Sequence, residues 1–429
     1  MASIRPDSPN ILGYASPPAA ANPWHAVIRY IVLAIVLGFV IGTFFGTRKP
    51  DTQDQDFGAY YRAGQAAIAG TSPYTVDSHG PLGAYMYAPV FALTAFRCLA
   101  HLPYLWAVRT FMLINWIATI LCVRLCLGLM RAPGRDLLIL GIIALVPTGD
   151  YLKANLHNGQ VGTLLLLSCV SWLCLMLRGR SFLGGLVLSL AVALKLYPAL
   201  LVPYLLLRKD WRGIAGVTVG VLILFGVPMF FVGIHELIPL HVEWLKFCMK
   251  TQIVDQTIRT GNQSLLGVLA RLPLISNGNQ GLRSRENLQT LIQIYPAIIL
   301  AITAGVYGLL YVRKRNTVRD VALLLLWMTV ASPRAWTFNF AVEILPAMLL
   351  AAAILDRRPR SWLAILALLC APAALMFPTN LIHFSDHWTL AAYLLQNKHF
   401  DAAVIMGIAL VLVCQSSAGE SPHDVTAIL

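Results

Sequence analysis

The sequence predicts an all-α integral membrane protein, and two observations carry this prediction. Of the 429 residues, 58% are hydrophobic and only 12% are charged, about half the charged fraction of ordinary soluble domains. Long apolar stretches recur along the chain, and short connections rich in lysine and arginine separate them. In lipid such stretches form helices, because a helix satisfies its backbone polar groups internally.

The basic connections set the predicted orientation of the helices. Five of them are rich in Lys and Arg, at residues 131–135, 178–180, 208–212, 313–319 and 356–360. By the positive-inside rule we expect all five in the cytoplasm, which gives about twelve crossings and places both termini inside. The expected spans are 26–46, 104–130, 136–150, 159–177, 181–196, 197–207, 213–233, 290–312, 318–332, 336–355, 361–377 and 400–415. These connections also account for the net charge of +13, so no nucleic-acid partner is expected.

The domain organisation follows from this predicted membrane topology. We expect one polytopic domain over 26–415, with flexible cytoplasmic tails at 1–25 and 416–429, in the inner (plasma) membrane. Some expected spans are shorter than the roughly 20 residues that a straight crossing needs, so partial helices must be among them. Such broken helices usually line a cavity.

Four polar regions fall on the outer side, at 47–103, 150–158, 234–289 and 378–399. Residues 85–101 (YMYAPVFALTAFRCLAH) are apolar, but counting them as a span would move the later arginines to the wrong side. We therefore expect a helix lying at the outer surface there.

The first outer loop holds the strongest candidate for chemistry. The stretch DQDFGAYYRAGQAAIAGTSPYTVD begins at Asp54, and its alanines recur at helical spacing from Phe57 until Gly70. Asp56 therefore stands at or near the N-cap of a short interfacial helix. A carboxylate at the outer face can also act as a general base on a hydroxyl. The pattern alone leaves the cap and the catalytic base equally open.

Four basic residues are candidates for binding a phosphate. Lys195, in AVALKLYPALLVP, lies in an apolar run, where an ammonium needs an anionic partner unless it snorkels to the outer interface. Arg334, in the outward turn ASPRAWTFNF, either clamps the same phosphate or is solvated. Arg259 and Arg271 flank TGNQSLLGVLAR in the long outer loop, and each is either a phosphate ligand or a surface charge.

Polar and aromatic residues of the outer side are candidates for substrate binding. LHNGQVGTLL, from Leu156, places His157 and Gln160 at the start of the fourth crossing, the helix end that attracts anions and polar ligands, although Asn158 can also be an ordinary cap. The tyrosines either contact a substrate or belong to an interfacial aromatic belt. The candidates are Tyr60, Tyr61, Tyr85, Tyr87, Asp150, His157, Gln160, Asn262, Gln263 and Trp336.

Patterns for other kinds of site are missing from the sequence. It contains no Walker or Gly-x-Gly pattern, no His pair at zinc spacing and no CxxC, so we expect no nucleotide, metal or other cofactor. Chemistry at the outer face and a cation at the bilayer edge instead suit a substrate that is itself a lipid phosphate.

Six motifs, in this order, resemble glycosyltransferase family 87. They are DFGAYYRAGQAAIAGTSPY, YMYAPVFALTAF, NGQVGTLLLL, GGLVLSLAVALKLYPALLVPYLLLRKDWRG, NQSLLGVLAR and SPRAWTFNFAVEILPA, and they span residues 56–346. The best-known members of this family are phosphatidylinositol-mannoside mannosyltransferases. The resemblance implies a GT-C-type fold and inverting transfer, on the extracytoplasmic face, from a polyprenyl-phosphate-linked sugar, typically mannose, to a glycolipid or glycan acceptor.

The resemblance also assigns two residues and shows one departure. Asp56 matches the catalytic aspartate of the family, and Lys195 matches the lysine of its K-x-x-P motif. Mannoside-making relatives tend to show SP-x-SW-x-HH, where this chain has Phe338 and Asn339 in place of the histidines, so the acceptor and the sugar stay open. A transporter or flippase of lipid-linked sugars and a non-catalytic assembly partner are the alternative functions.

Overall fold

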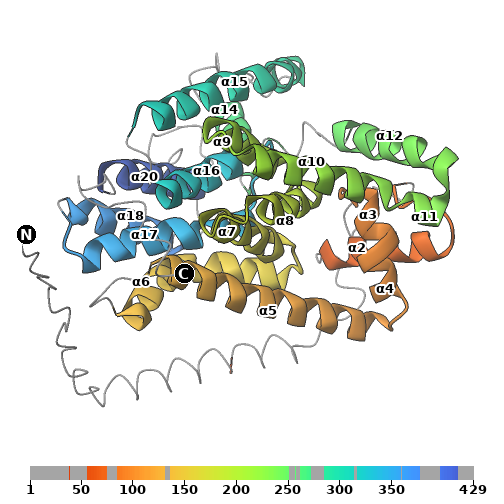
Figure 1. Ribbon diagram of the computed structural model, residues 1–429, viewed down its shortest axis with the longest axis horizontal. Coiled ribbons are helices and arrows are strands. Elements are labelled where there is room, and N and C mark those ends of the chain that lie inside the picture. Colours follow the sequence, from red (N-terminus) through yellow and green to blue (C-terminus); the bar gives the residue numbers. More distant parts are fainter. Residues whose placement is uncertain are drawn as a thin grey trace, which may run out of the picture. The chain divides into compact units, whose positions relative to one another are not determined.

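The computed structural model describes most of the chain after residue 55. The described residues are 38, 56–74, 85–130, 136–250, 257, 261–271, 285–313, 316–358, 360–376 and 397–413. The chain divides into two compact units, Met1–Gly46 and Thr47–Leu429, and every described residue except Gly38 lies in the second unit. Its described elements are all helices, as predicted (Figure 1). The expected span 26–46 and both expected tails lie outside the described residues.

Five helical stretches in the described part of the chain are long and apolar enough to cross a membrane. They are α5 (Tyr104–Leu129), α6 (Leu137–His157), α10 (Trp211–Gly226) with α11 (Met229–Val232), α15 (Arg285–Val312), and η4 (Thr337–Glu343) with α17 (Ile344–Leu355). The shorter helices of the expected spans are α7 (Gly162–Leu177), α8 (Ser181–Leu194), η2 (Tyr197–Leu201) with α9 (Val202–Leu207), α16 (Thr317–Ala331), α18 (Ser361–Met376) and α20 (Lys398–Val413). The number of crossings beyond these five stays a prediction.

The segments predicted to be outer loops also contain helices. Residues 47–103 carry α2 (Asp56–Ile68) and, further on, α3 (Pro89–Phe91), the π-helical turn η1 (Ala92–Phe96) and α4 (Arg97–Ala100), which directly follow one another. Residues 234–289 carry α12 (Ile234–Lys250) and α14 (Leu265–Ala270). The helix expected within 85–101 is therefore present. It begins at Pro89, whose fixed φ suits a first helical turn.

One predicted boundary is wrong. Residues 150–157 continue α6 instead of forming an outer polar loop, and His157 ends this helix instead of opening the next one. Pro147 lies inside α6 without ending it, because the buried stripe of the helix continues beyond it through Tyr151 and Asn155. Burial of this face outweighs the one backbone hydrogen bond that a proline removes.

Helices α8 and α10 pack with their backbones in contact. A Cβ atom on Gly185 would collide with the carbonyl oxygen of Gly213, and one on Gly216 would collide with that of Phe182. Glycines at a helix–helix interface allow this close approach, which lets packing hold helices together where lipid surrounds them.

Buried polar side chains connect the helices next to this pair. Thr163 of α7 donates a 2.6 Å hydrogen bond to Oδ1 of Asn115 on α5, and Asn155 of α6 donates to Oγ1 of Thr163 at 3.3 Å. Because polar groups in an apolar interior need partners, these bonds fix three helices relative to one another.

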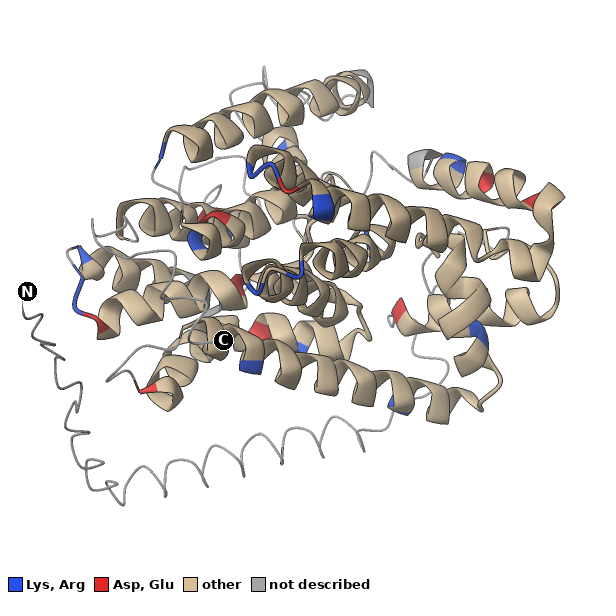
Figure 2. Cartoon of the chain, viewed as in Figure 1, with Lys and Arg blue, Asp and Glu red and all other residues tan. Residues whose placement is uncertain are grey.

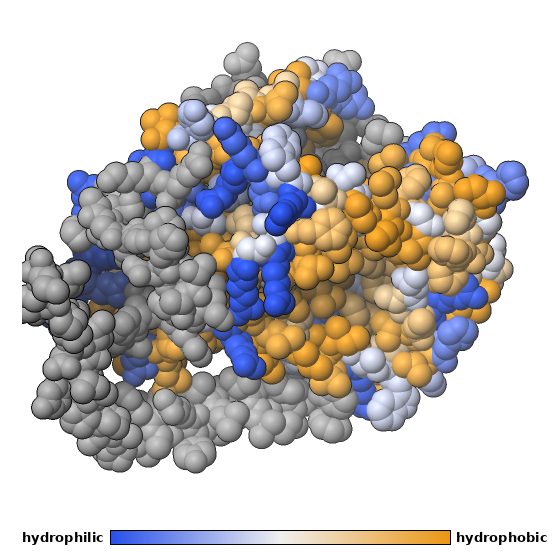
Figure 3. Space-filling model, viewed as in Figure 1, coloured by the Kyte–Doolittle hydropathy of each residue, from blue (hydrophilic) through white to orange (hydrophobic). Residues whose placement is uncertain are grey.

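The surface of the helices is largely apolar. Large hydrophobic side chains are exposed along α5, α10, α15 and α18, and the face in Figure 3 shows broad hydrophobic areas. Helices α7, α8 and α17 contain no charged residue (Figure 2). Exposed apolar surface on this scale is typical of lipid-facing helices.

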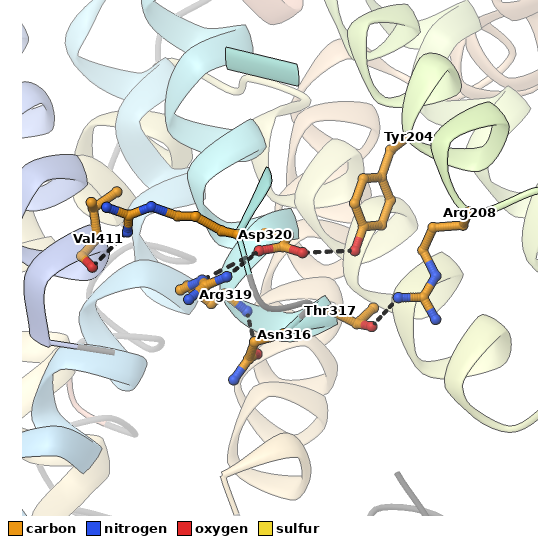
Figure 4. Close-up of polar contacts among 8 residues, drawn as sticks. Tyr204, Arg208, Asn316, Thr317, Arg319, Asp320 and Val411 are labelled. Carbon is orange, nitrogen blue, oxygen red and sulfur yellow. Dashed lines mark hydrogen bonds and ion pairs between the residues drawn. The ribbon is translucent and has the colours of Figure 1, made fainter. Parts of the chain in front are cut away.

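Two of the basic connections lie together. Arg319 and Asp320 form a buried ion pair of 3.0 Å at the start of α16, and the hydroxyl of Tyr204 on α9 donates to Asp320 at 3.2 Å (Figure 4). Arg208, just after α9, donates to Oγ1 of Thr317 at 2.7 Å. The connections that follow α9 and precede α16 are therefore neighbours, while their placement in the cytoplasm stays a prediction.

Candidate functional site

Helix α2 begins at Asp56, where the sequence predicts its start. It ends at Ile68 and is followed by Gly70, whose φ of 71° suits glycine at a helix end. Its buried face includes Phe57, and Tyr60 stacks on Phe96 of η1 with ring centroids 4.8 Å apart. Packing of this face therefore fixes the position of the Asp56 end of the helix.

The turn between α6 and α7 lies against the first turn of α2. Gly159 has a φ of 64°, and a Cβ atom there would lie 2.8 Å from Cβ of Phe57. This contact brings Gln160, which is almost fully buried, beside two tyrosines. The hydroxyls of Tyr60 and Tyr87 are 2.7 Å apart, and each lies 3.4 Å from Oε1 of Gln160. Three candidate substrate-binding residues thus share one cluster.

Lys195 lies at the break that follows α8. The residue is extended, with φ −149° and ψ 139°, and Pro198 lies in the short helix η2 that follows. Its ammonium donates a 2.9 Å hydrogen bond to Oδ1 of Asn339, and lies 5.4 Å from the ring centroid of Phe338 and 5.9 Å from that of Tyr197. Both residues that replace the expected histidines therefore contact the predicted phosphate-binding lysine.

Asp56 and Lys195 influence each other electrostatically. Burial raises the pKa of the Asp56 carboxyl to about 6, and the Lys195 ammonium opposes this rise. Burial also raises the pKa of Tyr60, with smaller contributions from Tyr87 and from the charge of Asp56. The structure therefore brings the predicted base, the predicted phosphate cation and the tyrosine cluster into one electrostatic environment.

Arg334 is connected to this environment through its backbone. Its carbonyl oxygen accepts a 3.1 Å hydrogen bond from Nδ2 of Asn339, while its guanidinium Nη1 lies 3.3 Å from Sδ of Met86. Its Nη2 is buried and has no hydrogen-bond partner among the described residues. An uncompensated guanidinium nitrogen of this kind suits an anionic ligand.

Arg271 belongs to a second polar group. Its Nη2 donates to the carbonyl oxygen of Asn262 at 2.7 Å and to Oδ1 of Asn397 at 2.6 Å. Asn262 in turn accepts from the backbone of Ala335 at 3.0 Å through its Oδ1, and the backbone of Gln263 donates to the carbonyl oxygen of Ala335 at 2.7 Å. These contacts favour a structural role for the NQS motif: it holds the turn that carries Arg334.

The remaining candidates make their polar contacts away from Tyr60, Tyr87 and Gln160. Tyr61 donates to the carbonyl oxygen of Leu102 at 2.8 Å, and the ring of Trp336 packs on Gly261. Asp150 and His157 are exposed on α6, and within the described residues no hydrogen bond joins them to the cluster. Arg259 lies outside the described residues. Among the described residues no group of three His, Cys, Asp or Glu side chains could hold a metal ion.

Two residues of the site were not among the sequence candidates. The sequence marked Asn339 only as a departure from the family pattern, and in the structure it is buried directly before Phe340. Nothing in the sequence singled out Met86, whose backbone carbonyl accepts from Nε1 of Trp244 at 3.1 Å and whose sulfur contacts Arg334.

Comparison with known proteins gives two findings. The sequence model of glycosyltransferase family 87 matches residues 85–333. A polyprenol-phosphate-mannose-dependent alpha-(1-2)-phosphatidylinositol mannoside mannosyltransferase of Mycolicibacterium smegmatis is 25% identical over 284 residues, which are 64% of this chain and 60% of that protein. The chain thus matches over less than two thirds of the length of this curated relative.

Proposed function

Because the chain belongs to glycosyltransferase family 87, we propose that it transfers a sugar from a polyprenyl-phosphate donor to a hydroxyl of a glycolipid or glycan acceptor. The observation that carries this proposal is that one buried side chain, Asn339, contacts both Lys195 and Arg334 and so gathers two basic residues suited to a donor phosphate, within electrostatic range of the Asp56 carboxyl. Mannose is the proposed sugar, since the matched relative is named as dependent on polyprenol-phosphate mannose.

The reaction needs a base on one side of the sugar and an anion site on the other. Asp56 accepts the proton of the acceptor hydroxyl while that oxygen attacks the anomeric carbon. The bond from this carbon to the phosphate oxygen breaks, and the lipid phosphate leaves with the bonding electrons. Attack from the face opposite the leaving phosphate inverts the anomeric configuration.

Lys195 stabilises the negative charge that develops on the departing phosphate. Asn339 accepts a hydrogen bond from its ammonium without cancelling its charge, so the full positive charge remains for the phosphate. Arg334 is the proposed second phosphate ligand, because its carbonyl oxygen accepts a hydrogen bond from the same Asn339 side chain. Tyr60, Tyr87 and Gln160 line the Asp56 side and are proposed to bind the sugar or the acceptor.

The proposed site faces the outer side of the membrane. Support comes from the positive-inside prediction, which places the basic connections on the opposite side, and from the neighbourhood of two of these connections. The flippase alternative needs a polar path through the membrane, whereas the candidate residues near Asp56 gather at one end of α7 and α8.

Reconstitution separates the enzyme from its alternatives. Purified protein in liposomes receives a radiolabelled polyprenyl-phosphate mannose and, in parallel reactions, candidate glycolipid acceptors. We expect labelled product from the wild type and almost none from Asp56→Asn. Movement of the donor across the bilayer without transfer would support a flippase, and neither transfer nor movement would support an assembly partner.

A further inference from the structure

Helix α12 has three distinct faces. At 100° per residue, Leu237, Leu240 and His241 fall on one side, and all three are buried. The second side carries Ile234, Ile238, Val242 and Leu245, at spacings of four, four and three residues, and all four are exposed. The third side carries the polar and charged residues His235, Glu236, Glu243 and Lys246. A helix in water would have two faces, whereas this one has a second apolar face that no described residue covers.

The exposed apolar face continues the surface of a candidate membrane span. The span Trp211–Val232 exposes Leu222 (64%) and Phe230 (79%), and α12 follows it after a turn at Gly233 with a φ of 81°. Helix α12 then lies beside the end of α10, because the rings of Phe225 and His241 have centroids 3.8 Å apart (Figure 1). The exposed apolar surface of the span therefore continues onto α12, and the same surroundings contact both.

The buried face of α12 contacts the candidate site. Trp244 and Cys248 both donate to the carbonyl oxygen of Met86, at 3.1 and 3.5 Å, and the sulfur of Met86 contacts Arg334. In the same segment 47–103, Ser72 donates to Oε2 of Glu243 on α12 at 2.7 Å. Helix α12 thus forms an outer wall next to Arg334 and the Tyr87 segment.

We propose that the face Ile234, Ile238, Val242 and Leu245 is embedded among the acyl chains of the outer leaflet, so that α12 is a lipid-contacting wall of the site. Three apolar turns of helix bury enough surface in lipid to fix the position of the helix, while its polar face stays in the headgroup region or in water. Through Met86, insertion of α12 into lipid then positions the guanidinium of Arg334. This inference concerns a surface and does not depend on the proposed transfer reaction.

Two residues of α12 make a matched pair for a test. Ile238 and Glu236 are two positions apart and point to nearly opposite sides of the helix, and both are exposed (Ile238 64%). Single cysteines are placed at 238, at 236 and, as the lipid reference, at Leu222 in a background with Cys98, Cys248, Cys370 and Cys414 changed to Ser. Serine at 248 keeps a donor for Met86.

Each cysteine is labelled with the fluorophore NBD, and the protein is reconstituted in phosphatidylcholine–phosphatidylglycerol vesicles. We expect NBD at 238 to be quenched by a doxyl-labelled lipid, as at 222, and protected from aqueous iodide, with the reverse at 236. Equal quenching by iodide at 238 and 236 would overturn the proposal. Protection of 238 from both quenchers would also overturn it, and would indicate a protein partner instead.

Discussion

The ammonium of Lys195 donates a 2.9 Å hydrogen bond to Oδ1 of Asn339, a residue 144 positions further along the chain. The amide of Asn339 also donates to the carbonyl oxygen of Arg334 at 3.1 Å. One neutral side chain, 4% exposed, therefore links the two basic residues proposed to bind the donor phosphate. Because an amide oxygen orients an ammonium without neutralising it, Asn339 is a positioning residue for Lys195.

Replacing Asn339 should weaken donor use without removing any charge. Asn339→Leu deletes a hydrogen bond to a charged group, worth about 1.5–3 kcal/mol, so we expect kcat/KM for the donor to fall about 10- to 150-fold. Steady-state kinetics at varied donor concentration measure this. Asn339→Gln, which keeps the amide, should recover part of the loss; a Leu variant with wild-type kinetics would remove Asn339 from the site.

Removing the Asp56 base should abolish most of the transfer. Asp56→Asn keeps the size of the side chain, but its amide cannot accept the hydroxyl proton, so we expect a loss of about 10²- to 10⁴-fold in turnover with normal membrane expression. A radiochemical transfer assay measures this. Asp54→Asn, two residues upstream, is the matched control and should stay near the wild type. If Asp56→Asn also kept near wild-type turnover, Asp56 would be only a helix cap.

The pH dependence should report the pKa of Asp56. The carboxyl acts as a base only when ionised, and burial raises its pKa to about 6, so transfer should fall as the pH drops through about 6. Because the Lys195 ammonium opposes this rise, Lys195→Met should move the acidic limb to higher pH. Profiles of kcat/KM against pH for both proteins measure the shift. An acidic limb at the same pH in both would show that the charge of Lys195 does not act on the Asp56 carboxyl.

The charge of Lys195 should matter for activity more than for folding. Lys195→Met keeps the apolar stem and removes a costly buried charge, so we expect equal or higher thermal stability. Losing one charge-assisted contact to a phosphate costs about 2–4 kcal/mol, or roughly 30- to 1000-fold in transfer efficiency, and Lys195→Arg should recover only part. Lower stability with unchanged activity per folded molecule would identify a structural lysine.

Cysteine accessibility should test the predicted membrane topology. In a background without native cysteines, single cysteines at 75 and 280 should react with an impermeant thiol reagent added from outside, whereas those at 314 and 358 should not. Labelling of intact cells followed by gel shift measures this. The opposite pattern would invert the topology and place the Asp56 cluster in the cytoplasm.

The fold was predictable where composition and period decide it. Apolar length located α5, and alanine spacing located α2 from Asp56 onward, because both signals are local. The end of α6 was missed at residue 150, because burial of Tyr151 and Asn155 against other helices decides it and leaves no local mark.

The site was predictable in part for the same reason. A lone carboxylate and a lone lysine in apolar surroundings attract attention in any sequence, and Asp56 and Lys195 do lie in one environment. In the sequence Arg271 looked equivalent to Arg334, because both are basic residues next to polar motifs. In the structure, however, Nη2 of Arg271 donates to Oδ1 of Asn397. Only the packing of distant segments distinguishes a cation held by the protein from one with an uncompensated nitrogen.

The backbone contact between α8 and α10 ties a remote position to the chemistry. Lys195 directly follows α8, and ten residues earlier Gly185 touches the carbonyl oxygen of Gly213. A methyl group at Gly185 would push the two helices apart and swing the far end of α8, carrying the ammonium away from Asn339. In a genetic screen, a substitution at this glycine would look like a defect in donor recognition although the residue never meets the donor.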